Sequence, residues 1–324
     1  AFTRIFETIF SNQVRAQKDS LPVTFTYFED FAFSPNDNFI LIQSQVEKLF
    51  YTSTKEFNYI WNRSTKTLKP VSADGKQSYV SFSPDNRRIA YIREGNLYIK
   101  DLQNDQVTAI TSDGSPGRML YGMADALYEN GFGMKQAYQW SPDGNSIAFL
   151  RFNETVVQDY PITSYEGRPY PDIFNQRYPK AGEAIPDVQV YIYNIPGKSL
   201  SKADIGVNPN QYITGIRWQP DASALWVQRL NRTQTILEVL RINARNGVAR
   251  KLFEETATDY VKVFPENMHF LLSKNALLWL SEKSGSAQIY EVALNNGAMK
   301  PITAGKNEVV SIDGVDEDNG ELYY

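Results

Sequence analysis

The sequence contains a single histidine, His269, and this residue limits the chemistry that the chain can perform. One imidazole cannot supply the paired histidines of a zinc peptidase, and no Gly-x-Ser-x-Gly segment is present to form the nucleophile elbow of a serine hydrolase. Because His269 follows a proline-containing turn and precedes the apolar run 270–272, we expect it at the edge of a strand. The sequence therefore predicts no catalytic residue and no metal site in this chain.

A second group that could do chemistry is the acidic run Asp316-Glu317-Asp318-Asn319-Gly320. Closely spaced carboxylates followed by glycine are typical of the first half of a calcium loop. The distal glutamate that completes such a loop is missing at the required offset, whereas Asp, Asn and Gly are the usual residues of a tight turn. We therefore interpret this run as a hairpin turn.

Composition excludes several further classes of function. The chain has 324 residues, 33 Lys and Arg against 37 Asp and Glu, and no cysteine. Disulfides, thiolate metal sites and a cysteine nucleophile are thus impossible, and the slightly acidic balance gives no basic surface for nucleic acid. No uncharged apolar run is long enough to span a membrane, and no motif predicts a cofactor.

The elements that must position any functional residue are short strands joined by a repeated turn. The turn begins with serine or another residue, followed by proline and then by Asp, Asn or Glu. It stands between an aromatic or apolar strand end and a second apolar strand. Proline presets φ and the following Asp or Asn accepts hydrogen bonds from the turn backbone. The five copies are 34–37, 83–86, 141–144, 219–222 and 264–267.

These turns recur every 45 to 80 residues, roughly, and a unit of about 40–50 residues with several strands is typical of a β-propeller blade. We therefore predict an all-β fold, a β-propeller built of four-stranded antiparallel blades. The two longest intervals require insertions, which we place at 114–132 and 153–187. Insertions in particular repeats are where function tends to concentrate.

The chain divides into two unequal parts. Residues 1–19 form an N-terminal helix and linker, because apolar residues recur at helical spacing over 3–12. Residues 20–324 form the propeller domain. Since a propeller must close to hide its strand edges, we expect the natural protein to continue past Tyr324 and this chain to hold part of an eight-bladed propeller.

Residues 28–324 resemble the N-terminal propeller of the dipeptidyl peptidase IV family of serine exopeptidases. The most specific segments are Phe152-Asn153-Glu154-Thr155, Arg177-Tyr178-Pro179-Lys180-Ala181-Gly182 and the preceding strand and turn at 140–149. The order of these segments is more specific than the turn repeat, which many propellers share. A bacterial member of the family is expected.

The resemblance implies a non-catalytic propeller in front of an α/β-hydrolase domain of the same protein, which carries the catalytic Ser, Asp and His. The parent protein is then a serine-type dipeptidyl or tripeptidyl aminopeptidase, whereas this chain alone is not an enzyme. The propeller gates the cavity and anchors the free N-terminus of the peptide substrate. By the same resemblance the protein is periplasmic or secreted.

The family holds the substrate ammonium with two acidic residues on a short helix, and the matching segment here is 125–132. In this sequence the pair is reduced to Glu129, with Asn130 next to it and Gly131 in the slot of an expected Glu. A propeller arginine of the family aligns with Tyr51 or Thr52. The resemblance thus implies Glu129, Asn130, Tyr128 and Tyr51 as substrate-binding residues. We expect Asp125 to be a capping or turn residue.

The insertion 153–187 is rich in aromatic residues, prolines and arginines, a composition that suits an interface core. The resemblance implies an arm here that joins two subunits, so we predict a projecting arm and a homodimer. The alternative is that the segment folds back and covers its own propeller.

Two other functions remain open at this point. The first is a scaffold or binding module, the propeller of an inactive peptidase homologue, because both substrate anchors are altered. The second is a glycosidase-type propeller with paired carboxylates in the channel. A Gly-x-Ser-x-Gly elbow followed by Asp and His in the gene beyond Tyr324 would separate an enzyme from a scaffold.

Overall fold

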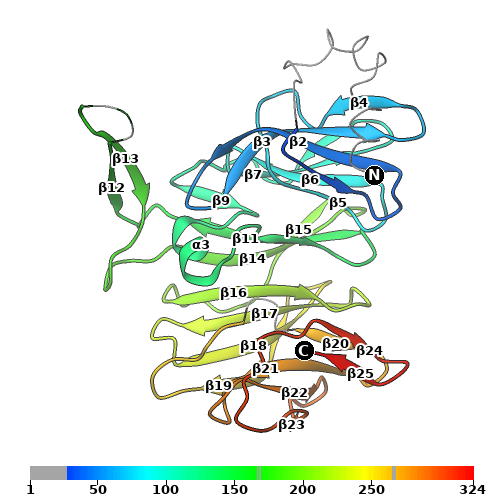
Figure 1. Ribbon diagram of the computed structural model, residues 1–324, viewed down its shortest axis with the longest axis vertical. Coiled ribbons are helices and arrows are strands. Elements are labelled where there is room, and N and C mark those ends of the chain that lie inside the picture. The colour runs from blue at the N-terminus through cyan, green and yellow to red at the C-terminus, as the bar shows by residue number, and fades with distance from the viewer. Residues whose placement is uncertain (1–27, 166, 168, 265–267) are drawn as a thin grey trace.

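The computed structural model describes residues 28–165, 167, 169–264 and 268–324, so the helix predicted at 3–12 lies outside the described residues. In the described part, antiparallel sheets follow one another along the molecule in the order of the sequence (Figure 1). One short helix, α3 (Ala126–Phe132), and one two-stranded hairpin lie on the same side of this row of sheets (Figure 1).

Each of the five main sheets in the described residues contains a path of four antiparallel strands, and we call these sheets blades 1 to 5. The predicted all-β fold with four-stranded antiparallel blades is therefore confirmed. Blades 1 and 2 consist of β1 (Asp30–Phe33), β2 (Phe39–Lys48), β3 (Thr54–Asn62), β4 (Thr67–Pro70), β5 (Ser78–Phe82), β6 (Arg88–Arg93), β7 (Asn96–Asp101) and β8 (Val107–Ala109). Blades 3 and 4 consist of β10 (Tyr138–Trp140), β11 (Ser146–Asn153), β14 (Asp187–Asn194), β15 (Ser199–Lys202), β16 (Gln211–Trp218), β17 (Ala224–Asn231), β18 (Ile236–Asn243) and β19 (Ala249–Thr256). Blade 5 consists of β20 (His269–Leu271), β21 (Ala276–Ser281), β22 (Gln288–Ala293) and β23 (Met299–Pro301).

In blades 1 to 4 the repeated turn joins the first and second strands, as predicted. The prediction is wrong for blade 5, because the copy at 264–267 precedes the first strand, β20, and the apolar run at 270–272 belongs to β20 rather than to the second strand. In blade 3, the Ser141 hydroxyl donates to Asp143 at 2.6 Å and accepts from the Ser146 amide at 2.8 Å, which closes the turn between β10 and β11. The fourth position of the turn has a positive φ, which is 69° at Gly144 and 60° at Asn86 in the corresponding turn of blade 2. Glycine and asparagine tolerate this left-handed conformation best, which explains their place in the repeat.

The core is formed between blades by the central strands. The largest fully buried side chains include Trp226 on β17 and Trp279 on β21. The Trp279 indole N–H donates to the Glu255 carboxylate at 3.0 Å, so this buried donor is satisfied. His269 begins β20, which confirms the predicted position at a strand edge.

Both predicted insertions contain ordered structure. The first holds β9 (Met119–Tyr121), which pairs with β11, and the helix α3. The second holds β12 (Asp159–Ser164) and β13 (Asp172–Arg177), which pair with each other in register from Asp159↔Arg177 to Ser164↔Asp172. This hairpin stands away from the blades (Figure 1), so the predicted projection of the arm is confirmed.

The final residues form a small hairpin of β24 (Gly314–Asp316) and β25 (Glu321–Tyr323). Its turn is the acidic run 316–320, where Asp316 accepts hydrogen bonds from the Asn319 amide at 3.0 Å and the Asn319 side chain at 2.8 Å. The acidic residues therefore build a turn, as predicted.

Candidate functional site

The helix α3 is fixed by a cap at each end. Asp125 is the N-cap residue, with φ −82° and ψ 176°, and its side chain accepts a hydrogen bond from the Tyr128 amide at 3.0 Å. Gly133 ends the helix with φ +67° and donates its amide to the Glu129 carbonyl at 3.1 Å. A left-handed residue at this position is a common helix stop. The predicted capping role of Asp125 is therefore confirmed.

The carboxylate of Glu129 binds the loop that joins β2 to β3. Its Oε1 atom accepts hydrogen bonds from the Thr52 amide, from the Thr52 hydroxyl at 2.7 Å and from the Ser53 amide at 3.1 Å. Its Oε2 atom accepts from the Ser53 hydroxyl. Four donors from two successive residues thus tie α3 to blade 1 across a separation of 76 or 77 residues in the sequence.

These contacts determine the charge of Glu129. Burial acts to raise the pKa of this carboxyl group, but the hydrogen bonds from Ser53 and Thr52 outweigh burial and hold the pKa below its ordinary value. Glu129 is therefore ionised at neutral pH. All four donors are neutral groups, so none of them cancels its negative charge.

Tyr128 is on the buried face of α3, and none of its surface is exposed. Its hydroxyl accepts a hydrogen bond from the Ile213 amide of β16 at 3.1 Å, and its ring packs edge-on against Phe152 with centroids 4.8 Å apart. A side chain in this position cannot touch a peptide on the outer surface. The prediction that Tyr128 contacts a substrate directly is therefore wrong. Tyr128 instead fixes α3 to blade 4.

The other two predicted residues lie on the outside. Tyr51 immediately precedes the bound pair Thr52 and Ser53, and it is 78% exposed. Asn130 follows Glu129 on α3 and is also exposed. The hydrogen bonds of Glu129 hold the segments that carry Tyr51 and Asn130 next to each other.

Two buried carboxyl groups near the helix were not predicted as a pair. Asp125 is 1% exposed and Glu154, which follows β11, is 2% exposed. Within the described part of the chain, the Oδ2 atom of Asp125 and the Oε2 atom of Glu154 have no hydrogen-bond partner. Burial raises the pKa of Asp125 to about 7, and burial together with the charge of Asp125 raises the pKa of Glu154 to about 8.

This pair predicts a pH-dependent stability. Because both pKa values are higher in the folded state than in the unfolded chain, the folded state holds more protons between pH 5 and 8. The free energy of unfolding should therefore fall as the pH rises through this range. Where the folded state holds one proton more than the unfolded state, the fall is about 1.4 kcal/mol for each pH unit. Thermal unfolding of Asp125→Asn/Glu154→Gln should show a smaller decrease in Tm from pH 5 to pH 8 than the wild type shows.

The exposed Asp259 provides the control, since Asp259→Asn removes a carboxyl group without changing a buried one. This variant should keep the decrease in Tm of the wild type. A double variant whose Tm decreases as much as that of the wild type would contradict the assignment of the pH dependence to Asp125 and Glu154.

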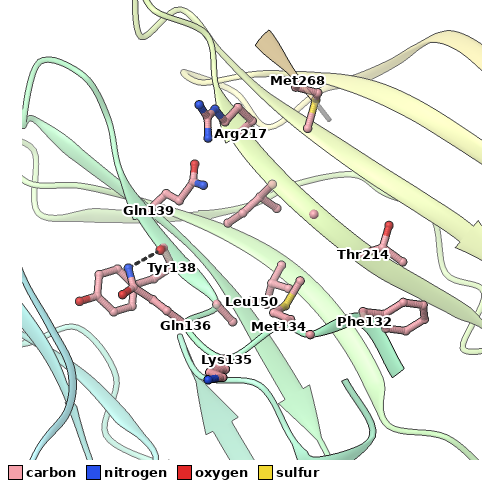
Figure 2. Close-up of a pocket in the computed structure, with 14 residues that line it drawn as sticks. Phe132, Met134, Lys135, Gln136, Tyr138, Gln139, Leu150, Thr214, Arg217 and Met268 are labelled. Carbon is pink, nitrogen blue, oxygen red and sulfur yellow. Dashed lines mark hydrogen bonds between the residues drawn. The ribbon is translucent and has the colours of Figure 1, made fainter. Parts of the chain in front are cut away.

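A cavity of about 300 Å³ lies at the C-terminal end of α3, between blades 3 and 4. Figure 2 shows Phe132 and Met134 on one side of it, Gln139 and Arg217 on another, and the hydrogen bond from the Gln136 side chain to the Tyr138 carbonyl, which measures 3.0 Å. The described residues that line it include two cations, Lys135 and Arg217, and no carboxylate. This cavity therefore suits an ammonium group less well than the neighbourhood of Glu129 does.

Among the described residues, no cluster of three His, Asp or Glu side chains is suitable for holding a metal ion. Likewise, in the described ranges, no helix has the length and apolar character needed to cross a membrane.

Comparison with known proteins gives a consistent set of similarities. Residues 34–324 match a family model described as the dipeptidyl peptidase IV N-terminal region. The crystal structure of Porphyromonas gingivalis dipeptidyl peptidase 4 superposes with a TM-score of 0.87 and 29% identity, over 93% of this chain and 43% of that chain.

Two curated relatives illustrate the range of functions among similar proteins. A probable dipeptidyl peptidase 4 of Aspergillus flavus is 29% identical over 98% of this chain and 43% of its own length. The inactive dipeptidyl peptidase 10 of Rattus norvegicus is 27% identical over 90% of this chain and 39% of its own length. The chain thus spans less than half the length of these relatives.

Proposed function

We infer the function of this chain from its family, since the chain belongs to the dipeptidyl peptidase IV family and matches its N-terminal region. We propose that the chain is the non-catalytic propeller of a serine-type aminopeptidase. An α/β-hydrolase domain of the same protein would carry the catalytic Ser, Asp and His. The propeller would gate the cavity between the two domains and hold the free N-terminus of the peptide, so that two or three residues are released.

The observation that carries this proposal is the ionised Glu129 on α3, a residue that is 6% exposed. Its Oε1 atom accepts three hydrogen bonds, whereas its Oε2 atom accepts one, from Ser53. A carboxylate oxygen has two lone pairs, so Oε2 has the capacity for a further donor such as a substrate ammonium. A charge-assisted hydrogen bond at a partly desolvated position is stronger than one between neutral groups.

The other predicted residues would act around this anchor. Tyr51 and Asn130, both exposed, would line the approach to Glu129. Tyr128 would support α3 from below through its hydrogen bond with Ile213.

A second function, a scaffold in an inactive homologue, is favoured by a different observation. Only Glu129 remains of the acidic pair expected on α3, Gly131 stands in the slot of the second acid, and Glu129 is already engaged with Thr52 and Ser53. In this case Glu129 would only fix the loop. The similarity to an inactive dipeptidyl peptidase is compatible with this alternative.

The arm supports a proposed homodimer. Large apolar side chains are exposed on it, with Tyr170 at 83%, Ile173 at 66% and Phe174 at 56%. Exposed apolar clusters of this kind mark interaction surfaces. We also propose, from the family resemblance, that the protein is periplasmic or secreted.

Restoring a second carboxylate on α3 tests the anchoring function by gain rather than loss. A side chain at Gly131 would meet no atom within 4 Å of its Cβ, and removing a helical glycine is favourable. In the full-length protein, Gly131→Glu should lower KM for dipeptide substrates with a free N-terminus by roughly tenfold, which is near the lower limit for one added charge-assisted hydrogen bond.

The matched control is Gly131→Gln, which has the same shape without the charge. The glutamine variant should leave KM within twofold of the wild type. Equal improvement by the two variants, or no change with glutamate, would argue against ammonium anchoring at this helix.

A further inference from the structure

Tyr79 on β5 has an unusual backbone conformation. Its φ is +53°, and it is the only aromatic residue among the described non-glycine residues with positive φ. The pairing of β5 with β6 shifts register between Ser78 and Ser81, so Tyr79 lies in a β-bulge. A bulky residue in this region of φ/ψ is strained and persists only where the surroundings enforce it. Bulges often re-aim a side chain beside a functional site.

The bulge directs the Tyr79 hydroxyl at the loop that binds Glu129. This hydroxyl donates a hydrogen bond to the Ser53 Oγ atom at 2.5 Å, and Ser53 Oγ in turn donates to Glu129 Oε2. Since a serine hydroxyl has one hydrogen, accepting from Tyr79 leaves that hydrogen free to bind the carboxylate. Successive donors polarise one another, so the bond to Glu129 is strengthened.

The position of Tyr79 is itself enforced by blade 3. The hydroxyl of the buried Tyr138 on β10 donates to the Tyr79 carbonyl and lies 2.8 Å from the Ser81 hydroxyl. A continuous series of contacts therefore runs from β10 through β5 and Ser53 to α3. Burial, with the negative charges of Glu129 and Glu56, raises the pKa of Tyr79 to about 12, so its hydroxyl remains a donor at physiological pH.

We propose that Tyr79 is a positioning residue, which acts through Ser53 to hold Glu129 and the loop at 51–53 in the geometry that receives the peptide N-terminus. This inference rests on the proposed function of Glu129. It assigns a role to a strained strand residue that touches neither the substrate nor the helix. Its consequence is that the substrate anchor depends on the relative placement of blades 1, 2 and 3.

The test compares Tyr79→Phe with the wild type in the full-length protein. The variant loses one hydroxyl and keeps the ring. Amide hydrogen exchange should become faster at residues 49–55, because the Thr52 and Ser53 amides are held less firmly. KM for free-amine dipeptide anilides should rise by about three- to tenfold with kcat within twofold. The acidic limb of the kcat/KM profile should move to higher pH, because the Glu129 carboxylate is less stabilised.

Ser53→Ala should reproduce these changes, since it removes the group between Tyr79 and Glu129. Tyr193→Phe, at the far end of β14 from α3, loses a phenolic hydroxyl elsewhere and should change none of them. Unchanged exchange at 49–55 in Tyr79→Phe, or faster exchange without a change in KM, would overturn the positioning role. Failure of Glu129→Gln to alter discrimination between free and acetylated peptides would instead overturn the proposed function.

Discussion

The Glu129→Gln variant of the full-length protein should have a kcat/KM for free-amine dipeptide anilides that is about 10- to 150-fold lower than that of the wild type. This decrease corresponds to a loss of about 1.5–3 kcal/mol of transition-state stabilisation. The carboxylate is the group expected to attract the substrate ammonium, and an amide has no charge. In addition, the amide nitrogen cannot accept the hydrogen bonds that Ser53 and Thr52 donate, so the loop at 51–53 should be held less firmly.

A matched control is Glu291→Gln on β22 in blade 5, remote in the fold from α3. It should retain the activity of the wild type, and both variants should be checked for folding by their Tm. Unchanged kcat/KM in a folded Glu129→Gln variant would leave Glu129 with its structural role alone and would favour the scaffold function.

Shortening the arm should convert the full-length protein from a dimer to a monomer, with half the mass in light scattering. The structure allows a conservative deletion. Residues 161–175 can be replaced by Asn-Gly, because Tyr160 and Gln176 are directly paired and can carry a two-residue turn. This design keeps the ion pair of 3.2 Å between Arg177 and Asp159, and the hydrogen bonds of Arg177 to Gly117 and Val157, which fix the base of the arm.

The loss of dimer should follow from lost apolar contact rather than from misfolding. Replacing Tyr170, Ile173 and Phe174 by serine in an arm of full length should therefore have the same effect as the deletion. If the wild type and both variants have the same mass, the arm is not the dimer contact.

The fold was predictable because its signal is local and repeated. Ser141 and Asp143 lie two residues apart, and the hydrogen bonds they make close a turn of a few residues. The same pattern in blades 1 and 2 predicts strand pairs from residues that are close together in the sequence. The capping role of Asp125 was predictable for the same reason, because an N-cap bonds to an amide three residues away.

The site was less predictable because its contacts are not local. Glu129 was singled out by family resemblance, but nothing in the sequence indicates that Thr52 and Ser53, 77 and 76 residues away, saturate its Oε1 atom. The resemblance implies that Tyr128 contacts the substrate, and a helix of seven residues leaves little pattern to indicate which face is buried. The bulge at Tyr79 has no sequence signal, since an aromatic residue in a strand normally has negative φ.

Asp125 and Glu154 illustrate a different limit. Each is an acidic residue beside a turn or strand end, where a solvated carboxylate is the usual outcome. Their burial follows from the packing of α3 against blades 3 and 4 and from the pairing of β9 with β11, which both depend on the inserted segment. A buried carboxyl pair of this kind can therefore be found only from the structure.

Anchoring of a free peptide N-terminus by this propeller can be measured as the ratio of two kcat/KM values. In the full-length wild type, kcat/KM should be measured for a dipeptide anilide and for the same compound acetylated at its N-terminus. Acetylation removes the ammonium charge and leaves the scissile bond unchanged. If the propeller holds the substrate ammonium, the free-amine substrate should be preferred by at least about tenfold, and Glu129→Gln should largely abolish the preference. Equal kcat/KM for the free and acetylated substrates in the wild type would contradict the claim.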